Sequence, residues 1–379
     1  MTTPIRRRVS VDTEIKDKVA SVDVLNRLAL VHPVNAMPDN KRFILLTNDN
    51  YRENLKAEGL ETPLKFFQTH FSQEGGSPAD AYIIFQQVNE AGGEKVSDAV
   101  DRAIELGAQS YMYAYSETYS AEEEEQAKIL AAQKELAQYV EAHEQKIQCI
   151  LLTHDPDALG TETEEVTVND IGSLCRGLNL NRTTVIYHPT GIHKGWDYTG
   201  ERPDAAITGR MLYKDAGAEQ WDYKELTGVH DSNLEAGEQE ILISKGYNFV
   251  ETFTGTTFTH LFRGRTCTDR EIRIQWGADW FDNNLQASIM NFMFNNTAGL
   301  AAFDYPTFAA VEAIIREWGD RAMNRRIILD FEVTLPDPMS FTAAERKSGK
   351  AVINNAYFAT LNSAIDGWVV RGKWTIGGI

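Results

Sequence analysis

The chain contains 379 residues, a length that corresponds to about two ordinary domains. Hydrophobic residues make up 42% of it and aromatic residues 10%, which is enough for a sizeable core and argues against wholesale disorder. The net charge of −18 excludes a general binder of nucleic acid or anionic membranes unless a segregated basic face is present. It favours partners with basic patches, or other copies of the chain.

The cysteines and the N-terminus point to a reducing compartment. Cys149, Cys175 and Cys267 lie far apart, and no metal-ligand spacing accompanies them, so we expect small buried residues and no disulfide framework. Three arginines at residues 6–8 resemble the start of a signal peptide, but no apolar stretch follows them. No apolar run approaches the ~20 residues of a membrane helix. We therefore expect a protein that is made and kept in a cytoplasm.

Predicted strands and helices alternate along the first half of the chain. Short runs rich in apolar and β-branched residues predict buried strands at 42–47, 81–88, 110–116, 147–153 and 182–188. Apolar residues at helical spacing predict helices at 62–71, 97–106, 120–143, 171–177 and 205–213. A turn at 75–78 separates the first helix from the second strand. This alternation predicts an α/β layer.

The helix at 120–143 has the clearest pattern. Ser120 is placed to cap it, with Glu123 at the capping-box position. The acidic run at 122–125 lies at the positive end of the helix dipole. The run is therefore explained by helix chemistry and not by metal binding.

The last third of the chain has a different character. Amphipathic helices are predicted at 279–294 and 307–323, and a shorter one at 341–347. Strands are predicted at 326–335, 351–361 and 367–376. The fold class is thus α/β with a mixed α+β part, in which a small sheet runs to the end of the chain.

Both chain ends carry strand-like patterns with no evident hairpin partner. Near the N-terminus, Ile5, Val9 and Val11 are interleaved with basic and hydroxyl residues. The last strand is an edge strand or an arm that leaves the domain, because an isolated strand is unstable in water. Its apolar residues are Trp368, Val370, Trp374 and Ile376.

A search for catalytic or metal-binding motifs finds little. No phosphate-binding loop, nucleophile elbow or zinc-protease motif occurs. Asp279 and Asp282 lie at a spacing that suits paired acid and base groups, but Asp279 also falls where the first turn of the predicted helix favours negative charge, and we prefer that interpretation. His188 and His193 flank a turn, and without further ligands we interpret them as loop histidines. We predict no catalytic residue, metal or cofactor.

Four arginines, Arg316, Arg321, Arg325 and Arg326, form a basic cluster on and just after the helix at 307–323. They complement the C-terminus of that helix and solvate its surface, or they form a basic face that docks an acidic partner. Composition alone leaves both interpretations open.

Taken in order, several stretches resemble the contractile tail sheath proteins of tailed phages and related contractile injection particles. The stretches are Pro63–Phe67 with Gly75–Pro78 and Ala81–Ile84, Arg182–Pro189 with Ala205–Gly209, Trp221–Val229, Gly246–Phe249, Ala278–Asp282 opening a helix, and Ala343–Arg346 to the terminal strand. The resemblance covers most of residues 40–379, and its order and spacing carry it. The chain is short for the family, so it would be a minimal sheath protein.

The resemblance implies an N-terminal arm at 1–20, an outer α/β domain at 21–255, an inner tube-facing domain at 256–365 and a C-terminal strand arm at 366–379. The arms would add strands to neighbouring subunits. Hexameric rings of the chain would stack around a tail tube, contract, and drive the tube through a cell envelope. The arginine cluster would contact the tube, and baseplate and tail-terminator proteins would be further partners.

The same resemblance implies a location in a virion tail after assembly in a bacterial cytoplasm, with no direct contact to nucleic acid. Two alternatives remain open from the sequence. One is another component of a contractile particle, such as a baseplate or terminator protein. The other is a hydrolase that uses Asp279, Asp282 or His188.

Overall fold

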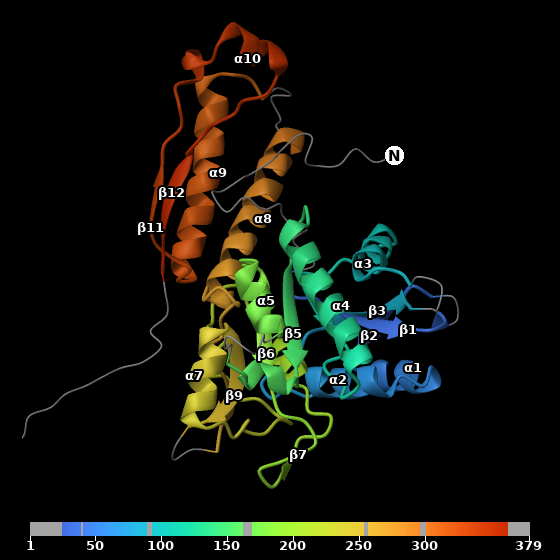
Figure 1. Cartoon of the computed structure of the whole chain (residues 1–379). Coiled ribbons are helices and arrows are strands. Elements are labelled where there is room, and N and C mark those ends of the chain that lie inside the picture. Colours follow the sequence, from blue (N-terminus) through green and yellow to red (C-terminus); the bar gives the residue numbers. More distant parts are fainter. Residues whose placement is uncertain are drawn as a thin grey trace, which may run out of the picture.

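The computed structural model describes residues 25–38, 41–88, 93–161, 169–253, 257–295 and 301–362. The predicted terminal strands at 5–11 and 367–376, with all seven of their named apolar residues, lie outside these ranges. Figure 1 shows an α/β body from which a smaller unit of helices and two strands projects.

An eight-stranded sheet forms the centre of the body, in the order β10–β9–β6–β5–β4–β1–β3–β2. The inner strands run parallel, whereas the edge strands β2 and β10 run antiparallel to their neighbours. The strands are β1 (Leu28–Val34), β2 (Phe43–Thr47), β3 (Asp80–Gln87), β4 (Met112–Tyr115), β5 (Gln148–Thr153), β6 (Thr183–Tyr187), β9 (Tyr247–Thr252) and β10 (Thr259–Phe262).

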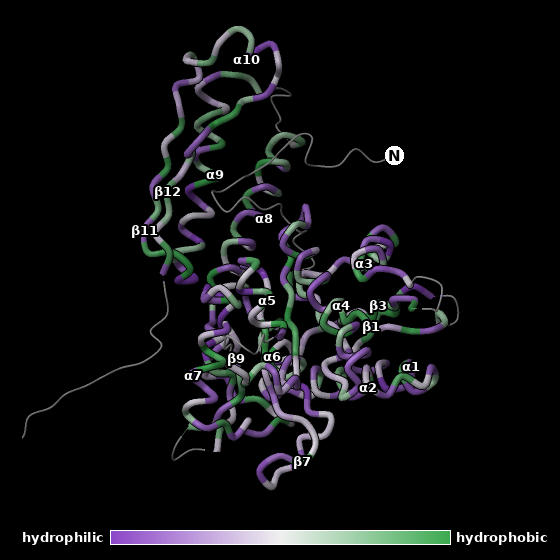
Figure 2. The backbone as a smooth tube through the Cα atoms, in the orientation of Figure 1, coloured by the Kyte–Doolittle hydropathy of each residue, from purple (hydrophilic) through white to green (hydrophobic). Residues whose placement is uncertain are grey.

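Helices cover both faces of this sheet. One face carries α2 (Glu61–Phe71) and α6 (Pro203–Met211), with α1 (Tyr51–Ala57) beside α2. The other carries α3 (Val96–Glu105), α4 (Glu123–Ala142), α5 (Ile171–Gly177) and α7 (Ala236–Ser244). Successive residues of a strand point to opposite faces, so Leu28 and Leu30 enter one core and Ala29 and Val31 the other. Figure 2 shows hydrophobic residues along much of β1, β3 and β5, as expected for parallel strands that are buried on both faces.

The projecting unit contains α8 (Ile272–Asn295), α9 (Tyr305–Asn324), β11 (Ile328–Val333), α10 (Ala343–Ser348) and β12 (Tyr357–Leu361). α9 packs against α8 and against β11, which forms a two-stranded antiparallel sheet with β12. At the opposite end of the molecule, β7 (Ile192–His193) and β8 (Trp196–Asp197) form a short hairpin.

The predicted mixed α/β class is confirmed, and so are most of the predicted elements. The strand at 42–47 exists as β2, but it is not buried: only Leu46 is, because β2 lies at the sheet edge. Five elements were not predicted from the sequence, namely β1, α1, α7, β9 and β10. β1 contains Pro33, whose missing N–H is tolerated near the end of the strand.

Two helix starts are corrected. α4 begins at Glu123, and Ser120 does not cap it. Instead, the Ser120 hydroxyl accepts from the Glu122 amide (3.2 Å), while Gln126 accepts from the Ser120 amide and donates to Asp155 (2.6 Å). These bonds tie the start of α4 to the loop after β5. α8 begins at Ile272, so the predicted opening at Asp279 is wrong.

Candidate interaction surface

The helix that carries the predicted arginine cluster, α9, has well-defined ends. Asp304 caps it by accepting from the Thr307 amide (2.9 Å), and Pro306 occupies the first turn, where no amide donor is needed. At the other end, Arg326 adopts a left-handed conformation (φ 58°) that turns the chain into β11. Gly319 permits close packing, because a Cβ there would lie 2.0 Å from the ring of Phe331 in β11.

The four arginines do not form one face. Arg316 points toward β11, pairing with Glu312 (2.6 Å) and donating to the Val333 carbonyl (3.3 Å). Arg321 and Arg325 point toward α8 instead. Their positions on α9 are one turn apart, so their side chains are neighbours.

Arg321 and Arg325 each lie over a tryptophan. The Arg321 guanidinium is 4.3 Å from the centre of the Trp318 ring and pairs with Glu317 (2.5 Å). The Arg325 guanidinium is 4.1 Å from the centre of the Trp280 ring. Stacking on indole rings restrains both guanidinium groups, and the edge of Arg325 pairs with the exposed Asp215 (3.3 Å).

The two arginines and two tryptophans line an open groove of about 460 Å³ between α8 and α9. Asn284 and Asn324 complete its lining. Two cations and two amides suit carboxylate acceptors, and bidentate guanidinium–carboxylate pairs are among the stronger polar contacts. We call this feature the Trp–Arg groove.

Arg326 does not line the Trp–Arg groove. Its carbonyl accepts from the buried Arg273 guanidinium (2.9 Å) and from the side-chain amide of Asn362 (3.0 Å). Arg273 also donates to the carbonyls of Asn362 and Gly217. Arg273 therefore joins the end of α9, the end of β12 and a loop of the body. Arg273 was not predicted as a functional residue, because these three carbonyls lie far away along the chain.

The β11–β12 sheet is open. Neither of its outer edges pairs with another strand among the described residues. Three large apolar side chains on this sheet are exposed, namely Leu329 (63%), Phe358 (59%) and Leu361 (45%). Unpaired strand edges with exposed apolar residues are surfaces onto which a further strand can add.

Asp279 and Asp282 are fully buried in ion pairs. Both oxygens of Asp279 accept from Arg182, each at 2.9 Å, and Tyr111 donates to the same carboxylate (2.7 Å). Asp282 pairs with Lys146 and accepts from Tyr357. Asp279 thus does not sit in a first helical turn, and the preferred interpretation of its charge is wrong. Both acids hold α8 against the amino ends of β5 and β6.

The two tyrosines in these contacts remain protonated donors. Burial, together with the charge of Asp279, raises the pKa of Tyr111. Burial and Asp282 likewise raise the pKa of Tyr357. The two acids of the hydrolase alternative are therefore occupied by structural partners.

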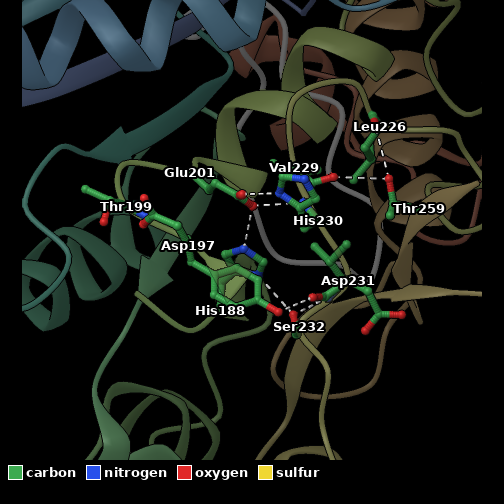
Figure 3. Close-up of polar contacts among 12 residues, drawn as sticks. His188, Asp197, Thr199, Glu201, Leu226, Val229, His230, Asp231, Ser232 and Thr259 are labelled. Carbon is green, nitrogen blue, oxygen red and sulfur yellow. Dashed lines mark hydrogen bonds and ion pairs between the residues drawn. The ribbon is translucent and has the colours of Figure 1, made fainter. Parts of the chain in front are cut away.

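His188, the third residue of the hydrolase alternative, is also occupied. Figure 3 shows its ring between Ser232 and Glu201, with Nδ1 2.9 Å from the Ser232 hydroxyl and Nε2 3.0 Å from a Glu201 oxygen. The order Ser–His–Glu resembles a nucleophile relay. However, the Ser232 hydroxyl is fully buried and also accepts from the Val250 amide (3.2 Å), so it is not presented to a substrate.

The same network anchors the β7–β8 hairpin. Glu201 accepts from the His230 amide (2.8 Å) and contacts its ring, and the His230 ring packs on Trp196 (5.4 Å between ring centres). Burial alone would raise the pKa of Glu201, but the bonds from the two histidines outweigh it and lower that pKa. His188 is thus a buried structural residue, whereas His193 lies in β7.

All three cysteines are buried and free, as predicted. Within the described ranges, no group of three or more His, Cys, Asp or Glu side chains is placed to hold a metal ion. None of the helices that the structure describes is long and apolar enough to cross a membrane.

No family model and no curated protein sequence matches the chain. Solved structures do resemble it. The contracted helical sheath of the anti-feeding prophage superposes with a TM-score of 0.61 and 14% identity over 99% of each chain. The contracted sheath of the PVC extracellular contractile injection system superposes with a TM-score of 0.61 and 11% identity over 96% of each chain. The sheath tail protein of Desulfitobacterium hafniense superposes with a TM-score of 0.52 and 8% identity, over 86% of this chain and 90% of that chain.

The chain has the fold of a contractile sheath protein. Coverage of nearly the whole chain by two assembled sheaths includes both the α/β body and the projecting unit. The stretches on which the sequence resemblance depends lie in this sheath fold at α2 and β3, at β6 and α6, in the loop between α6 and α7, in β9, and in α8 and α10. Identities of 14% and below explain why order and spacing, and no single motif, revealed it.

Proposed function

We propose that this chain is the structural subunit of a contractile sheath. The observation that carries the proposal is the superposition of nearly the full chain on two contracted sheaths. The subunits form hexameric rings that stack around a tail tube, and contraction of the stack drives the tube through a cell envelope. The particle assembles in a bacterial cytoplasm as part of a virion tail or a related injection device. Baseplate and tail-terminator proteins complete it, and the chain itself needs no cofactor.

The subunits are linked by strand addition. The predicted arms at 1–20 and 366–379 supply strands, and the open edges of β11 and β12 accept them. Each added strand satisfies backbone groups that water otherwise solvates, and many weak links together make a strong lattice. The exposed Leu329, Phe358 and Leu361 support this role for the sheet.

The arginine cluster contacts the tube. Arg316, Arg321, Arg325 and Arg326 are the proposed residues. The Trp–Arg groove favours Arg321 and Arg325, because both line it and pair with exposed acids, Glu317 and Asp215, that carboxylates of a partner can replace. Exposed charge pairs suit a contact that must break during contraction, because they leave no large apolar surface behind.

The proposed domain division keeps residues 21–255 as the outer domain and 256–365 as the inner, tube-facing domain. The projecting unit lies in the second range. β10 also lies there, yet it pairs with β9 in the sheet of the body. The proposed boundary therefore falls within a hairpin.

Electron microscopy of the purified chain tests the proposal. We expect long tubes of helical symmetry at high concentration, and decoration of a matching tail tube when that tube is present. Discrete rings that never stack would favour a terminator or baseplate component instead. A chain that stays monomeric at all concentrations, with or without a tube, would refute a sheath role.

A charge reversal tests the tube contact. The double variant Arg321→Glu and Arg325→Glu should reduce the tube-bound fraction at least tenfold in a sedimentation assay, because two favourable charges become repulsive toward an acidic tube. Lys56→Glu with Lys128→Glu, on the exposed surface of the body, makes the same change in net charge and should bind normally. Equal loss in both double variants would contradict a specific contact.

A further inference from the structure

A second hollow lies at the tip of the projecting unit, between the loop after β11, the loop before β12 and α10. It has a volume of about 490 Å³. Its walls include Thr334, Leu335, Pro336, Phe341, Val352 and Phe358. Val352 and Phe358 are each 59% exposed. We call it the tip hollow. Polar side chains, among them Ser340, Asn354 and Asn355, line the rest of it. A surface hollow that combines apolar walls with polar groups is typical of a binding site.

The C-terminal segment at 366–379 has the composition that such a hollow accepts. Trp368, Val370, Trp374 and Ile376 all lie at even-numbered positions, so an extended strand would carry them, together with Gly372, on one face. The other face carries Arg371 and Lys373. In this strongly acidic protein, that basic face is complementary to Glu345 in the wall of the tip hollow.

The C-terminal segment starts at the end of β12 that lies away from the tip hollow of the same subunit. The backbone N–H of Asn362 donates to the Ile327 carbonyl (3.0 Å), and the Arg273 guanidinium donates to the Asn362 backbone carbonyl. Asn362 follows the last residue of β12, whereas Phe358, which lines the hollow, is near the first. The chain therefore runs along β12 away from the hollow and would have to reverse direction to return to it.

The chain beyond Asn362 is long enough to reach another molecule. Fully extended, it spans about 40 Å between Asn362 and Trp374. The corresponding reach to Trp368 is about 20 Å, little more than the length of β12 itself. Trp374 is thus the tryptophan better placed to bridge two subunits.

We propose that the tip hollow binds Trp374 from the C-terminal segment of a second copy of the chain. The proposal rests on the strand arms of the proposed function and adds the pocket in which one arm is anchored. A buried tryptophan side chain removes about 150–250 Å² of its surface from water, and anchors of this kind contribute most of the binding energy at interfaces. The tip hollow gives the arm a fixed end point, which backbone pairing alone does not define.

Photo-crosslinking in the full-length chain tests this assignment. A benzophenone amino acid at position 352 should produce a covalent dimer, with the crosslink in the tryptic peptide that follows Lys373. The same group at Leu106, an exposed residue of the body, is the control and should give no crosslink to that peptide. Three results would overturn the proposal. They are crosslinks within one chain, crosslinks to residues 1–24, and the absence of any crosslink in protein that has assembled into tubes.

Variants of Trp374 complete the test. Trp374→Asp should lower the yield of the dimer crosslink at least tenfold, because the carboxylate has no apolar surface to bury and is repelled by Glu345 in the wall of the hollow. Trp374→Phe should keep most of it. Equal yields from both variants would contradict an aromatic anchor. A wild-type chain that stays monomeric contradicts the sheath role as well, whereas tubes whose position-352 crosslinks map elsewhere contradict only the tip-hollow assignment.

Discussion

Replacement of Asp279 by asparagine should destabilise the protein severely. The carboxylate takes two hydrogen bonds from Arg182 at 2.9 Å and one from Tyr111 at 2.7 Å, and all three side chains are essentially without solvent contact. An asparagine keeps the shape but removes the negative charge, and it turns one acceptor atom into a donor that faces other donors. The buried guanidinium then loses its ionic partner on α8.

Breaking one side of a buried ion pair costs about 3–5 kcal/mol. Native proteins are stable by roughly 5–15 kcal/mol, so the loss is a large share of the total. With a urea dependence of about 3 kcal/mol per molar, the unfolding midpoint should fall by at least about 1 M. Urea titrations followed by circular dichroism and by tryptophan fluorescence measure it, because Trp276 and Trp280 lie on the same helix.

Two further variants give the reasoning its controls. Asp320→Asn changes an exposed acid on α9 and should stay within about 0.5 kcal/mol of the parent. The double variant Arg182→Met with Asp279→Leu removes both charges and should cost less than Asp279→Asn alone. A midpoint for Asp279→Asn within 0.2 M or so of the parent would show that the pair does not hold α8 on the sheet.

Three more outcomes are expected. Deletion of residues 366–379 should leave a folded subunit that sediments as a monomer and forms no tubes; tubes like those of the full chain would remove the arm model. Gly209→Ala should cost about 3 kcal/mol, because the added Cβ would lie 2.0 Å from the His70 carbonyl oxygen and would push α6 off α2. Stability should fall with acid between about pH 6.5 and pH 4, since burial lowers the pKa of His32 and His154 to about 4.

The sign of the pH effect follows from which state binds the proton. Unfolded histidines take up protons below about pH 6.5, whereas the two folded ones remain neutral until about pH 4, so acid favours the unfolded chain. His154→Asn should flatten the dependence, and an unfolding midpoint that is constant from pH 7 to pH 4.5 would contradict the argument.

The control for Gly209→Ala is Gly177→Ala, because a Cβ at position 177 would have no atom within 4 Å.

Local patterns were sufficient for most of the secondary structure. The helix at 171–177 was predicted at its observed bounds, and the strand at 147–153 begins one residue early. Apolar spacing records the face that an element buries, and that face is a local property of the chain. The elements that were missed, such as β1 with Pro33 and α7 with its weak stripe, are those in which local signals conflict with their tertiary environment.

The sequence by itself determined the alternation of strands and helices, the free buried cysteines and the order of segments that resembles a sheath. Only the tertiary structure decided what the charged residues do. Arg182 and Asp279 are 97 positions apart, and Arg321 and Arg325 separate from Arg316 only because α8 and β11 pack on different sides of α9. The free energy of a charge depends on its burial and on its partner, and both are set by contacts between segments that local spacing does not encode.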